Sequence, residues 1–272
     1  MTINCKGELL SMDTPRVMGI LNHTPDSFYQ GSRVTQENIL VRTEQMLTQG
    51  ADFIDIGGYS TRPNAPEVSE AEELQRVVPM VRFLVQHFPE MRLSVDTFRS
   101  EVARQSLEEG ACLINDISAG LLDEQMLPTV AHYRVPYIAM HLVGTPQTMQ
   151  QHTQYQNIIT EMQYYFSERK AKALALGIND FIVDVGFGFS KTLEQNYEVL
   201  KYLDLFQQLG CPLLVGFSRK SMLYKLLGTT PSEALNATTV VNTLALTKGA
   251  RILRVHDVKE AKECIEIFKA IQ

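Results

Sequence analysis

Short apolar runs rich in valine and isoleucine recur along the whole chain, and longer segments with helical spacing of apolar residues separate them. Short apolar runs bounded by turn residues are typical of buried strands, and the segments between them are long enough for helices. Eight such units in 272 residues correspond to about 34 residues each, the size of a βαβ step. The predicted strands are Arg16–Asn22, Asp52–Ile56, Arg92–Asp96, Leu113–Ile117, Pro136–His141, Phe181–Asp184, Pro212–Phe217 and Arg251–Val255.

The segments between the predicted strands carry signals for the ends of helices. Ser69 with Glu72 forms a capping-box pattern, and Thr230 precedes a proline and then an acidic residue at the third position. Pro79 interrupts one helical pattern, which predicts a kink or a helix that begins late. In the last segment the apolar residues form one stripe that is expected to pack against a sheet, namely Ala261, Cys264, Ile265, Phe268 and Ile271.

An alternating series of parallel strands and helices can close into a barrel or form an open, doubly wound sheet. The repeats here are even in length, and no glycine-rich dinucleotide fingerprint follows the first strand. A closed barrel of this kind takes about 250 residues as one unit. The sequence therefore predicts the α/β class, with a single (β/α)8 TIM barrel domain spanning residues 1–272.

Composition and charge exclude several other classes of protein. The chain is 44% hydrophobic and has a formal net charge of −6, which excludes a disordered chain and a basic nucleic-acid binder. No apolar run approaches the ~18 residues of a membrane span, and the first residues lack the apolar stretch of a signal peptide. The four cysteines form no CxxC pair, so we expect buried, reduced thiols in a cytoplasmic protein.

Polar side chains end most of the predicted strands. The carboxyl ends of the strands build the active site of a (β/α)8 barrel. One polar strand end is as often a helix cap or a satisfied core group, but a whole series near one axis costs free energy that a ligand or a network must offset. The series comprises Asn22, Asp55, Asp96, Asn115, Asp116, His141, Asp184, Lys220, Arg254 and His256.

Four of these side chains suit a flat, nitrogen-rich ring. Asp96, Asn115 and Asp184 supply acceptors and an amide for the polar edge of a heterocycle. Lys220 follows the seventh predicted strand and can donate to a ring carbonyl. Together these residues predict a pocket for a purine or a pterin.

Three further side chains suit an anion and a metal ion. Arg254 and His256 have the same strand parity, so we expect both to point to one side and to hold a phosphate or diphosphate near helix N-termini. Asn22 offers a neutral oxygen of the kind that Mg²⁺ accepts when a diphosphate and waters complete its shell. These three residues predict a diphosphate site with Mg²⁺.

Two loops are longer than most strand-to-helix connections and are interpreted as substrate lids: NHTPDSFYQGSR and GGYSTRPNAPEVSE. A third segment, VGFGFSKT, has Ser190 where a nucleotide-binding phosphate loop needs glycine before the lysine, so we reject that interpretation. Instead, Phe187 and Phe189 flank Gly188 and could close on a planar ligand.

In the order of its motifs the chain resembles the dihydropteroate synthase family, from the first predicted strand to the last. The first four strands carry MGILNHTPDSF, DIGGYSTRPNA, SVDT and GACLINDISAG. The last four carry MHLVGTPQTMQ, DVGFGFSKTLEQNY, LLVGFSRKSML and RVHD. Agreement in this order over nearly the whole chain is highly specific.

The resemblance implies a cytoplasmic, homodimeric (β/α)8 transferase of folate biosynthesis that sulfonamides inhibit. Its substrates would be the small molecules 7,8-dihydropterin-6-ylmethyl diphosphate and 4-aminobenzoate, with Mg²⁺ as the cofactor and neither nucleic acid nor a membrane as a partner. Diphosphate would leave as the neutral aniline nitrogen attacks the exocyclic methylene. Catalysis would then rest on stabilising the leaving group and on positioning.

The resemblance also implies roles for residues at matching positions. The implied pterin site comprises Asp96, Asn115, Asp184 and Lys220. The implied diphosphate site comprises Asn22, Arg254 and His256, with Asn22 also as the metal ligand. The implied 4-aminobenzoate site comprises Phe28, Thr61, Arg62, Pro63, Phe189 and Ser221. Catalytic roles are implied for Asn22, Lys220, Arg254 and His256.

Four positions depart from the family pattern. His23 stands where an apolar residue is common, and Val185 stands where a proline usually follows the aspartate. Tyr59 replaces a frequent glutamate, and Gln30 replaces the usual aspartate of the first loop. The change at Gln30 bears on the role of that loop in a closed complex and leaves the predicted pterin pocket intact.

Three other functions stay open on the residues alone. A pterin-dependent methyltransferase barrel shares the pterin-binding features but needs a corrinoid partner, and the NHTPDSF and STRP loops argue against it. Lys220 could be the Schiff-base lysine of a barrel aldolase, although it follows directly on Arg219. A non-catalytic pterin-binding barrel is the third alternative, and only the departures in the first loop favour it.

Overall fold

The computed structural model describes residues 1–21, 33–59 and 67–272, and its centre is a closed barrel of eight parallel strands. Each strand pairs with the next one along the chain, and the last strand closes on the first. Each strand also overlaps one of the eight predicted from the sequence, which confirms the predicted (β/α)8 barrel. The strands are β3 (Arg16–Ile20), β4 (Phe53–Gly57), β5 (Leu93–Asp96), β6 (Leu113–Asp116), β7 (Tyr137–Met140), β8 (Phe181–Asp184), β9 (Leu213–Val215) and β10 (Ala250–Val255).

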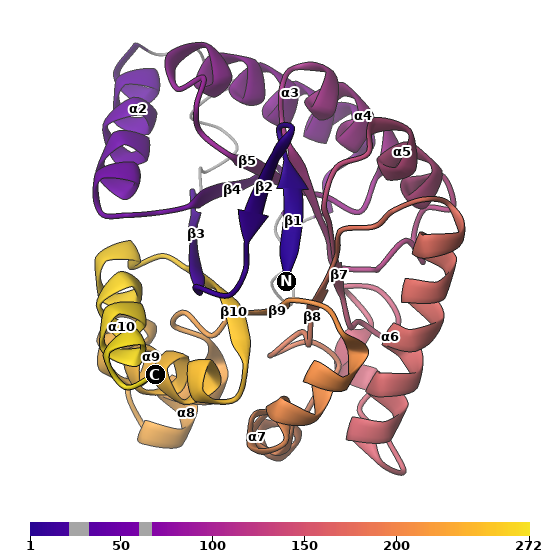
Figure 1. Ribbon diagram of the computed structural model, residues 1–272, viewed down its shortest axis with the longest axis vertical. Coiled ribbons are helices and arrows are strands. Elements are labelled where there is room, and N and C mark those ends of the chain that lie inside the picture. The colour runs from indigo at the N-terminus through magenta and orange to yellow at the C-terminus, as the bar shows by residue number, and fades with distance from the viewer. Residues whose placement is uncertain (22–32, 60–66) are drawn as a thin grey trace.

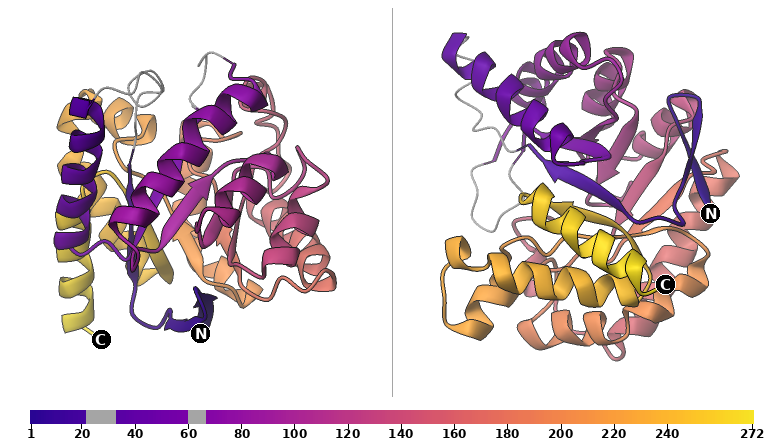
Figure 2. Two further views of the ribbon diagram at one scale, coloured as in Figure 1. Left: turned by 90° about the horizontal axis from the view of Figure 1, so that it is seen from above. Right: turned by 60° about the vertical axis from the view of Figure 1, so that its left-hand side comes forward.

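Helices surround this barrel on its outside (Figure 1; Figure 2). The strands are almost continuously buried because helices cover their outer face and side chains fill the interior. The helices are α2 (Arg33–Thr48), α3 (Glu70–His87), α4 (Ser100–Glu108), α5 (Met126–Tyr133), α6 (Ile158–Ala175), α7 (Leu193–Lys201), α8 (Ser221–Leu227), α9 (Leu235–Thr247) and α10 (Val258–Ala270). Short 3-10 turns add η1 (Met149–Gln151), η2 (Leu203–Leu209) and η3 (Pro231–Glu233).

The start of α3 follows the predicted cap, whereas its proline does not end it. The side chain of Ser69 accepts a hydrogen bond from the backbone N–H of Glu72, so this residue is the N-cap. The helix begins at Glu70 and continues through Pro79 to His87. The late start that Pro79 suggested is therefore wrong, because the cap and the buried stripe of α3 hold the helix on both sides of the proline.

Two other predicted helix features extend over fewer residues in the structure than the sequence suggests. Thr230 and Glu233 do form a capping box, but this box opens only the short turn η3. The sequence places Ile271 on the buried stripe of the last helix, whereas α10 ends one residue earlier and Ile271 is 70% exposed. The other four stripe residues are buried, so α10 packs on the barrel as expected.

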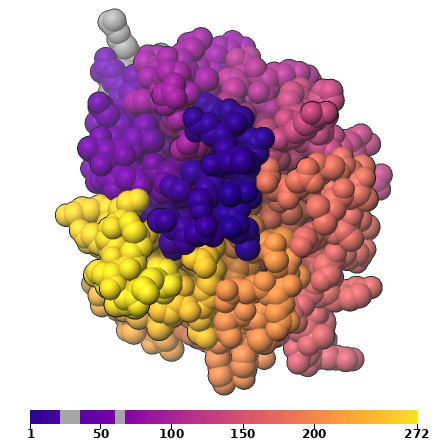
Figure 3. Space-filling model, viewed as in Figure 1, coloured from indigo at the N-terminus to yellow at the C-terminus, as the bar shows by residue number. Residues whose placement is uncertain are grey.

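An antiparallel hairpin that the sequence analysis did not predict closes the amino-terminal end of the barrel. It consists of β1 (Thr2–Cys5) and β2 (Glu8–Ser11), and it crosses the middle of the barrel in Figure 1 and in the space-filling view of Figure 3. The turn residues Lys6 and Gly7 have φ values of 55° and 80°, as tight hairpin turns require. Ile3 and Met12 pack with residues from inside the barrel, including Phe53.

The interior of the barrel is therefore divided between two ends with different chemistry. The end below the hairpin is apolar, and the other end carries the polar residues at the carboxyl ends of the strands. All four cysteines are buried and free, as predicted. Within the described ranges, no helix has the length and apolar character needed to cross a membrane.

Candidate functional site

A pocket lies at the carboxyl ends of the barrel strands, where the sequence predicts the active site. It brings together six of the predicted site residues from five strand ends and the loops that follow them. Ladder pairing places Asp96 beside Asn115, and Met140 beside Asp184. The pocket is lined by Asp96, Asn115, Ile117, Met140, Asp184, Phe189, Gly216, Lys220 and Arg254.

Arg254 connects the carboxylates of this pocket. Its Nε donates to Oδ2 of Asp55 over 2.7 Å, and its Nη2 donates to Oδ2 of Asp96 over 2.7 Å. Asn115 donates to the same Asp55 oxygen over 3.3 Å. The Asp55 side chain is fully buried, and 22% of the Arg254 side chain is exposed. Asp55 thus holds the guanidinium in the pocket, a role that its place in the series of polar strand ends did not reveal.

Burial and neighbouring charge shift the pKa values of the pocket residues in different directions. Burial raises the pKa of Asp96 to about 7, and Arg254 opposes this shift while Asp55 adds to it. Burial alone would lower the pKa of Arg254, but the two carboxylates outweigh it. Burial also raises the pKa of Asp184 and lowers that of Lys220 to about 8, and each of these two charges opposes the shift of the other.

Lys220 and Asp184 face the loop that follows β8. The Lys220 Nζ donates to the carbonyl of Phe187 over 2.5 Å and lies 4.8 Å from the centre of the Phe189 ring. Asp184 accepts from the backbone N–H of Gly186 over 2.8 Å. A side chain at Gly186 would come within 2.4 Å of a backbone oxygen, so only glycine fits this close turn.

Lys191 supports the same loop through contacts with its backbone carbonyls. Its Nζ contacts Nδ1 of His141 over 3.1 Å and donates to the carbonyls of Gly186 and Phe189 over 3.0 Å each. Burial lowers the pKa of Lys191 to about 7, and burial and then Lys191 lower that of His141. The lysine therefore points into the protein and supports the loop. In the sequence, Lys191 stands out only as the lysine of the rejected phosphate-loop pattern.

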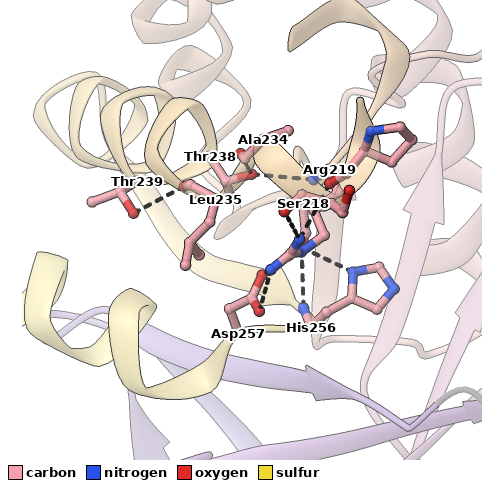
Figure 4. Close-up of polar contacts among 10 residues, drawn as sticks. Ser218, Arg219, Ala234, Leu235, Thr238, Thr239, His256 and Asp257 are labelled. Carbon is pink, nitrogen blue, oxygen red and sulfur yellow. Dashed lines mark hydrogen bonds and ion pairs between the residues drawn. The ribbon is translucent and has the colours of Figure 1, made fainter. Parts of the chain in front are cut away.

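His256 is anchored on the turn after β9, as Figure 4 shows. Its Nδ1 lies 2.9 Å from Oγ of Ser218, and its backbone N–H donates to the same oxygen over 3.2 Å. In the same turn, Arg219 forms an ion pair with Asp257 through contacts of 2.9 Å and 3.0 Å. Ser221 is the first residue of α8, directly after Lys220. His256, which follows β10, therefore contacts the turn that leads from β9 to Ser221.

Arg99 contacts residues at both ends of the second long loop, GGYSTRPNAPEVSE. Its Nη1 pairs with the fully buried Glu73 over 2.5 Å, and its Nη2 donates to the carbonyl of Val68 over 2.6 Å. Its guanidinium also lies 5.5 Å from the centre of the Tyr59 ring. The Tyr59 hydroxyl accepts a hydrogen bond from Gln147 over 2.5 Å. Tyr59, one of the departures from the family pattern, is thus part of this support.

Several predicted residues lie outside the described ranges. They are Asn22, Phe28, Thr61, Arg62 and Pro63, together with the departures His23 and Gln30. The fourth departure, Val185, is fully buried directly after Asp184. In the part of the chain that the structure describes, no group of three or more His, Cys, Asp or Glu side chains is placed to hold a metal ion.

Comparison with known proteins gives one consistent result. The family model for pterin binding enzymes matches residues 18–256. The chain is 42% identical over 275 residues to the dihydropteroate synthase of Escherichia coli K12, and the match covers 99% of this chain and 96% of that protein. The dihydropteroate synthase of Haemophilus influenzae is 40% identical over 273 residues, covering 99% and 98%.

Solved structures agree with these relatives. The structure of Yersinia pestis dihydropteroate synthase in complex with a sulfonamide drug has a TM-score of 0.92 and 42% identity, covering 100% of this chain and 99% of that one. The structure of the Xanthomonas albilineans enzyme with 4-aminobenzoic acid has a TM-score of 0.90 and 37% identity, covering 100% and 98%.

Proposed function

This chain belongs to the dihydropteroate synthase family of pterin-binding enzymes, and from that membership we propose how its pocket carries out the reaction. It is a transferase of folate biosynthesis that works on small-molecule substrates. We propose that it condenses 7,8-dihydropterin-6-ylmethyl diphosphate with 4-aminobenzoate to give 7,8-dihydropteroate and diphosphate. The observation that carries the proposal is that carboxylates, an amide, a lysine and an arginine converge in one pocket.

The pterin ring is proposed to bind through Asp96, Asn115, Asp184 and Lys220. All four side chains line one pocket, so they can contact different edges of one flat ligand. The carboxylates accept from ring N–H groups, and the ammonium of Lys220 donates to the ring carbonyl. Lys220 now donates to a backbone carbonyl, and it would exchange this bond for one to the pterin.

The diphosphate is proposed to bind through Arg254 and His256, together with Asn22. Arg254 keeps its charge because Asp55 and Asp96 raise its pKa. Ser218 orients the His256 ring through Nδ1. These two side chains would stabilise the charge that develops on the leaving diphosphate, which is the main requirement of this reaction.

The 4-aminobenzoate is proposed to bind on the other side of Lys220, beside Phe189 and Ser221. The Lys220 ammonium lies over the Phe189 ring, 4.8 Å from its centre, and this ring would stack on a second flat ligand. Phe28, Thr61, Arg62 and Pro63 from the two long loops would complete the site. The neutral aniline nitrogen would then attack the pterin methylene from a fixed position. Binding both substrates side by side makes a bimolecular reaction effectively unimolecular.

Magnesium is proposed as the cofactor, held by Asn22 together with the diphosphate. Mg²⁺ keeps several waters and takes phosphate oxygens with one or two protein ligands. This preference fits a site whose described residues hold no cluster of His, Cys, Asp or Glu for a metal ion. The bound ion would supply positive charge to the diphosphate, while Arg254 and His256 orient the leaving group.

We also propose that the chain forms a homodimer through α8, α9 and α10, of which α9 contacts both of the others. Leu227, Val240 and Ile267 on these helices are more than half exposed. Exposed apolar residues that gather in one patch mark interaction surfaces, so these helices are the proposed contact face. Light scattering after gel filtration should show twice the 30.7 kDa of one chain, and Val240→Glu should yield a monomer. A monomeric parent protein would contradict the proposal.

A cytoplasmic location stays a prediction.

Residues 1–272 are proposed to act as one domain. The pterin-binding family model spans most of the barrel, and the amino-terminal hairpin packs into the interior of the same barrel. Limited proteolysis of the free protein should therefore leave no stable fragment that lacks the hairpin. A folded, protease-resistant fragment without it would contradict the single domain.

The role of Lys220 gives a direct test of the proposed site. Lys220→Met removes the ammonium but keeps much of the apolar stem, so pterin affinity measured by calorimetry should fall by about tenfold or more. Lys225→Met is the matched control, because Lys225 is exposed on α8 and only five residues away. Equal affinity of both variants and the parent would refute the assignment. Trapping of a carbonyl substrate on Lys220 by borohydride would instead favour the aldolase alternative.

A further inference from the structure

Two buried cysteines meet where the amino-terminal hairpin packs on the barrel. Cys5 is the last residue of β1, and Cys112 lies just before β6. Their sulfur atoms are 3.1 Å apart, with the Cys5 thiol donating to Cys112. Both belong to the apolar cluster below the hairpin. All four thiols also donate to a backbone carbonyl, but Cys211 and Cys264 do so at other places in the fold.

We propose that Cys5 and Cys112 form a reversible disulfide when a peroxide reaches them, and that this bond fastens the hairpin to the barrel. A disulfide needs a sulfur–sulfur distance of about 2.05 Å. The two sulfur atoms must therefore approach by only about 1 Å, which side-chain rotation and a small shift of the hairpin can supply. The site lies at the end of the barrel opposite the candidate active site and is separate from it.

A cavity beside Cys112 gives a small oxidant access to this pair. Its volume is about 470 Å³, and it is lined by Cys112 together with Lys6, Tyr133 and Arg134, but not by Cys5. The hydrogen bond from Cys5 lowers the pKa of Cys112 in spite of burial, and Lys6 adds to this effect. The hydrogen bond to Cys112, and then burial, raise the pKa of Cys5. Cys112 is thus the thiol that a peroxide meets first, and Cys5 is the resolving thiol.

The peroxide oxidises the two thiols in two steps. The Cys112 sulfur attacks one oxygen of hydrogen peroxide, the O–O bond breaks, and the thiol proton leaves with the other oxygen as water. This step oxidises the sulfur to a sulfenic acid and reduces the peroxide. The Cys5 sulfur then attacks the Cys112 sulfur, the S–O bond breaks, and a second water leaves with the Cys5 proton. Two thiols and one peroxide give one disulfide and two waters.

The disulfide would close a long loop, because 107 positions separate the two cysteines. Long loops have the largest entropic effect on the unfolded chain. The hairpin is otherwise attached by side-chain packing and by a few polar contacts, such as that of Lys6 with the carbonyl of Pro89. We therefore expect the oxidised protein to melt about 5 °C or more above the reduced protein, with its synthase activity unchanged.

The test treats the full-length protein with hydrogen peroxide and maps its disulfides by mass spectrometry after digestion in the presence of a thiol-blocking reagent. The expected result is one cross-link between the peptides of Cys5 and Cys112, a loss of two of the four thiols, and a return of all four after dithiothreitol. Oxidation of Cys211 or Cys264 at the same peroxide dose without that cross-link would overturn the proposal. An unchanged or lower melting temperature of the cross-linked form would overturn the fastening of the hairpin.

Two variants separate the roles of the sulfur atoms. In Cys5→Ser the reaction should stop at the sulfenic acid of Cys112, which dimedone labels, and no disulfide should form. Cys264→Ser is the matched control, since it removes a buried thiol elsewhere and should keep the cross-link. Dimedone labelling of Cys112 in the parent protein as strong as in Cys5→Ser would show that Cys5 does not resolve the sulfenic acid. The map of the parent protein decides the proposal even if Cys5→Ser fails to fold.

Discussion

Replacing Asp55 by asparagine tests the support that Asp55 gives to Arg254, separately from the contacts that other residues make with the substrate. Asp55 is fully buried and accepts from Arg254 Nε over 2.7 Å, while Asp96 holds the Nη2 of the same guanidinium. Asp55→Asn keeps the shape and an oxygen acceptor but removes one negative charge. Arg254 then keeps a single carboxylate partner in the pocket.

The size of the effect follows from these contacts. Leaving a buried charge without its partner costs about 3 to 5 kcal/mol, but Arg254 keeps Asp96 and is 22% exposed. One charge-assisted hydrogen bond is worth about 1.5 to 3 kcal/mol. We therefore expect Asp55→Asn to lower the free energy of unfolding by about 1.5 to 3 kcal/mol. Because Asp55 helps to raise the pKa of Asp96, its loss should bring that pKa below its present value of about 7. Asp96 would then stay ionised at lower pH.

Urea unfolding and calorimetric pterin titrations over a range of pH measure the two effects separately. We expect Asp55→Asn to weaken pterin binding and to shift the acidic limb of its pH profile to lower pH. Asp52→Asn is the matched control: Asp52 pairs with Arg16 over 2.8 Å near the opposite end of the same strand. It should lose comparable stability without any change of the pH profile. An unshifted profile in Asp55→Asn, or a shift in both variants, would refute the coupling of Asp55 to Asp96 through charge.

Three further predictions concern the pocket and its support. Asp184→Asn should weaken pterin binding by about 1 to 3 kcal/mol through loss of a charge-assisted hydrogen bond, and unchanged calorimetric affinity would speak against the assignment. Lys191→Met should lower the free energy of unfolding by about 1 to 3 kcal/mol because two loop carbonyls lose their donor; urea unfolding beside Lys225→Met measures this, and equal stability of the two variants would contradict it. Sulfonamides should compete with 4-aminobenzoate in steady-state kinetics, and inhibition that varies only with the pterin substrate would be inconsistent with a shared site.

The barrel could be predicted from the sequence because each of its strands is a short apolar run between helix signals. The hairpin was missed, although its signal is present: Ile3 and Cys5 alternate with polar residues, and Lys6 and Gly7 form a two-residue turn. The same residues lack the apolar stretch of a signal peptide, and that feature alone does not reveal a hairpin. The extent of α10 was overestimated because the apolar pattern continues to Ile271 after the helix has ended.

The pocket residues could be predicted because barrel topology brings the carboxyl ends of all strands to one place. Their partners could not be predicted in the same way. Asp55 and Arg254 are 199 positions apart, and only closure of the barrel brings them within hydrogen-bond distance. The inward direction of Lys191 depends on the left-handed turn at Gly186 and Gly188, which the sequence pattern does not specify.

The release of diphosphate by the purified protein tests the central claim most directly. Dihydropterin diphosphate, 4-aminobenzoate and Mg²⁺ are supplied together, and each substrate is then omitted in turn. The account predicts diphosphate and 7,8-dihydropteroate in equal amounts only when both substrates are present. Diphosphate release that does not depend on 4-aminobenzoate, or pterin binding without any turnover, would contradict it.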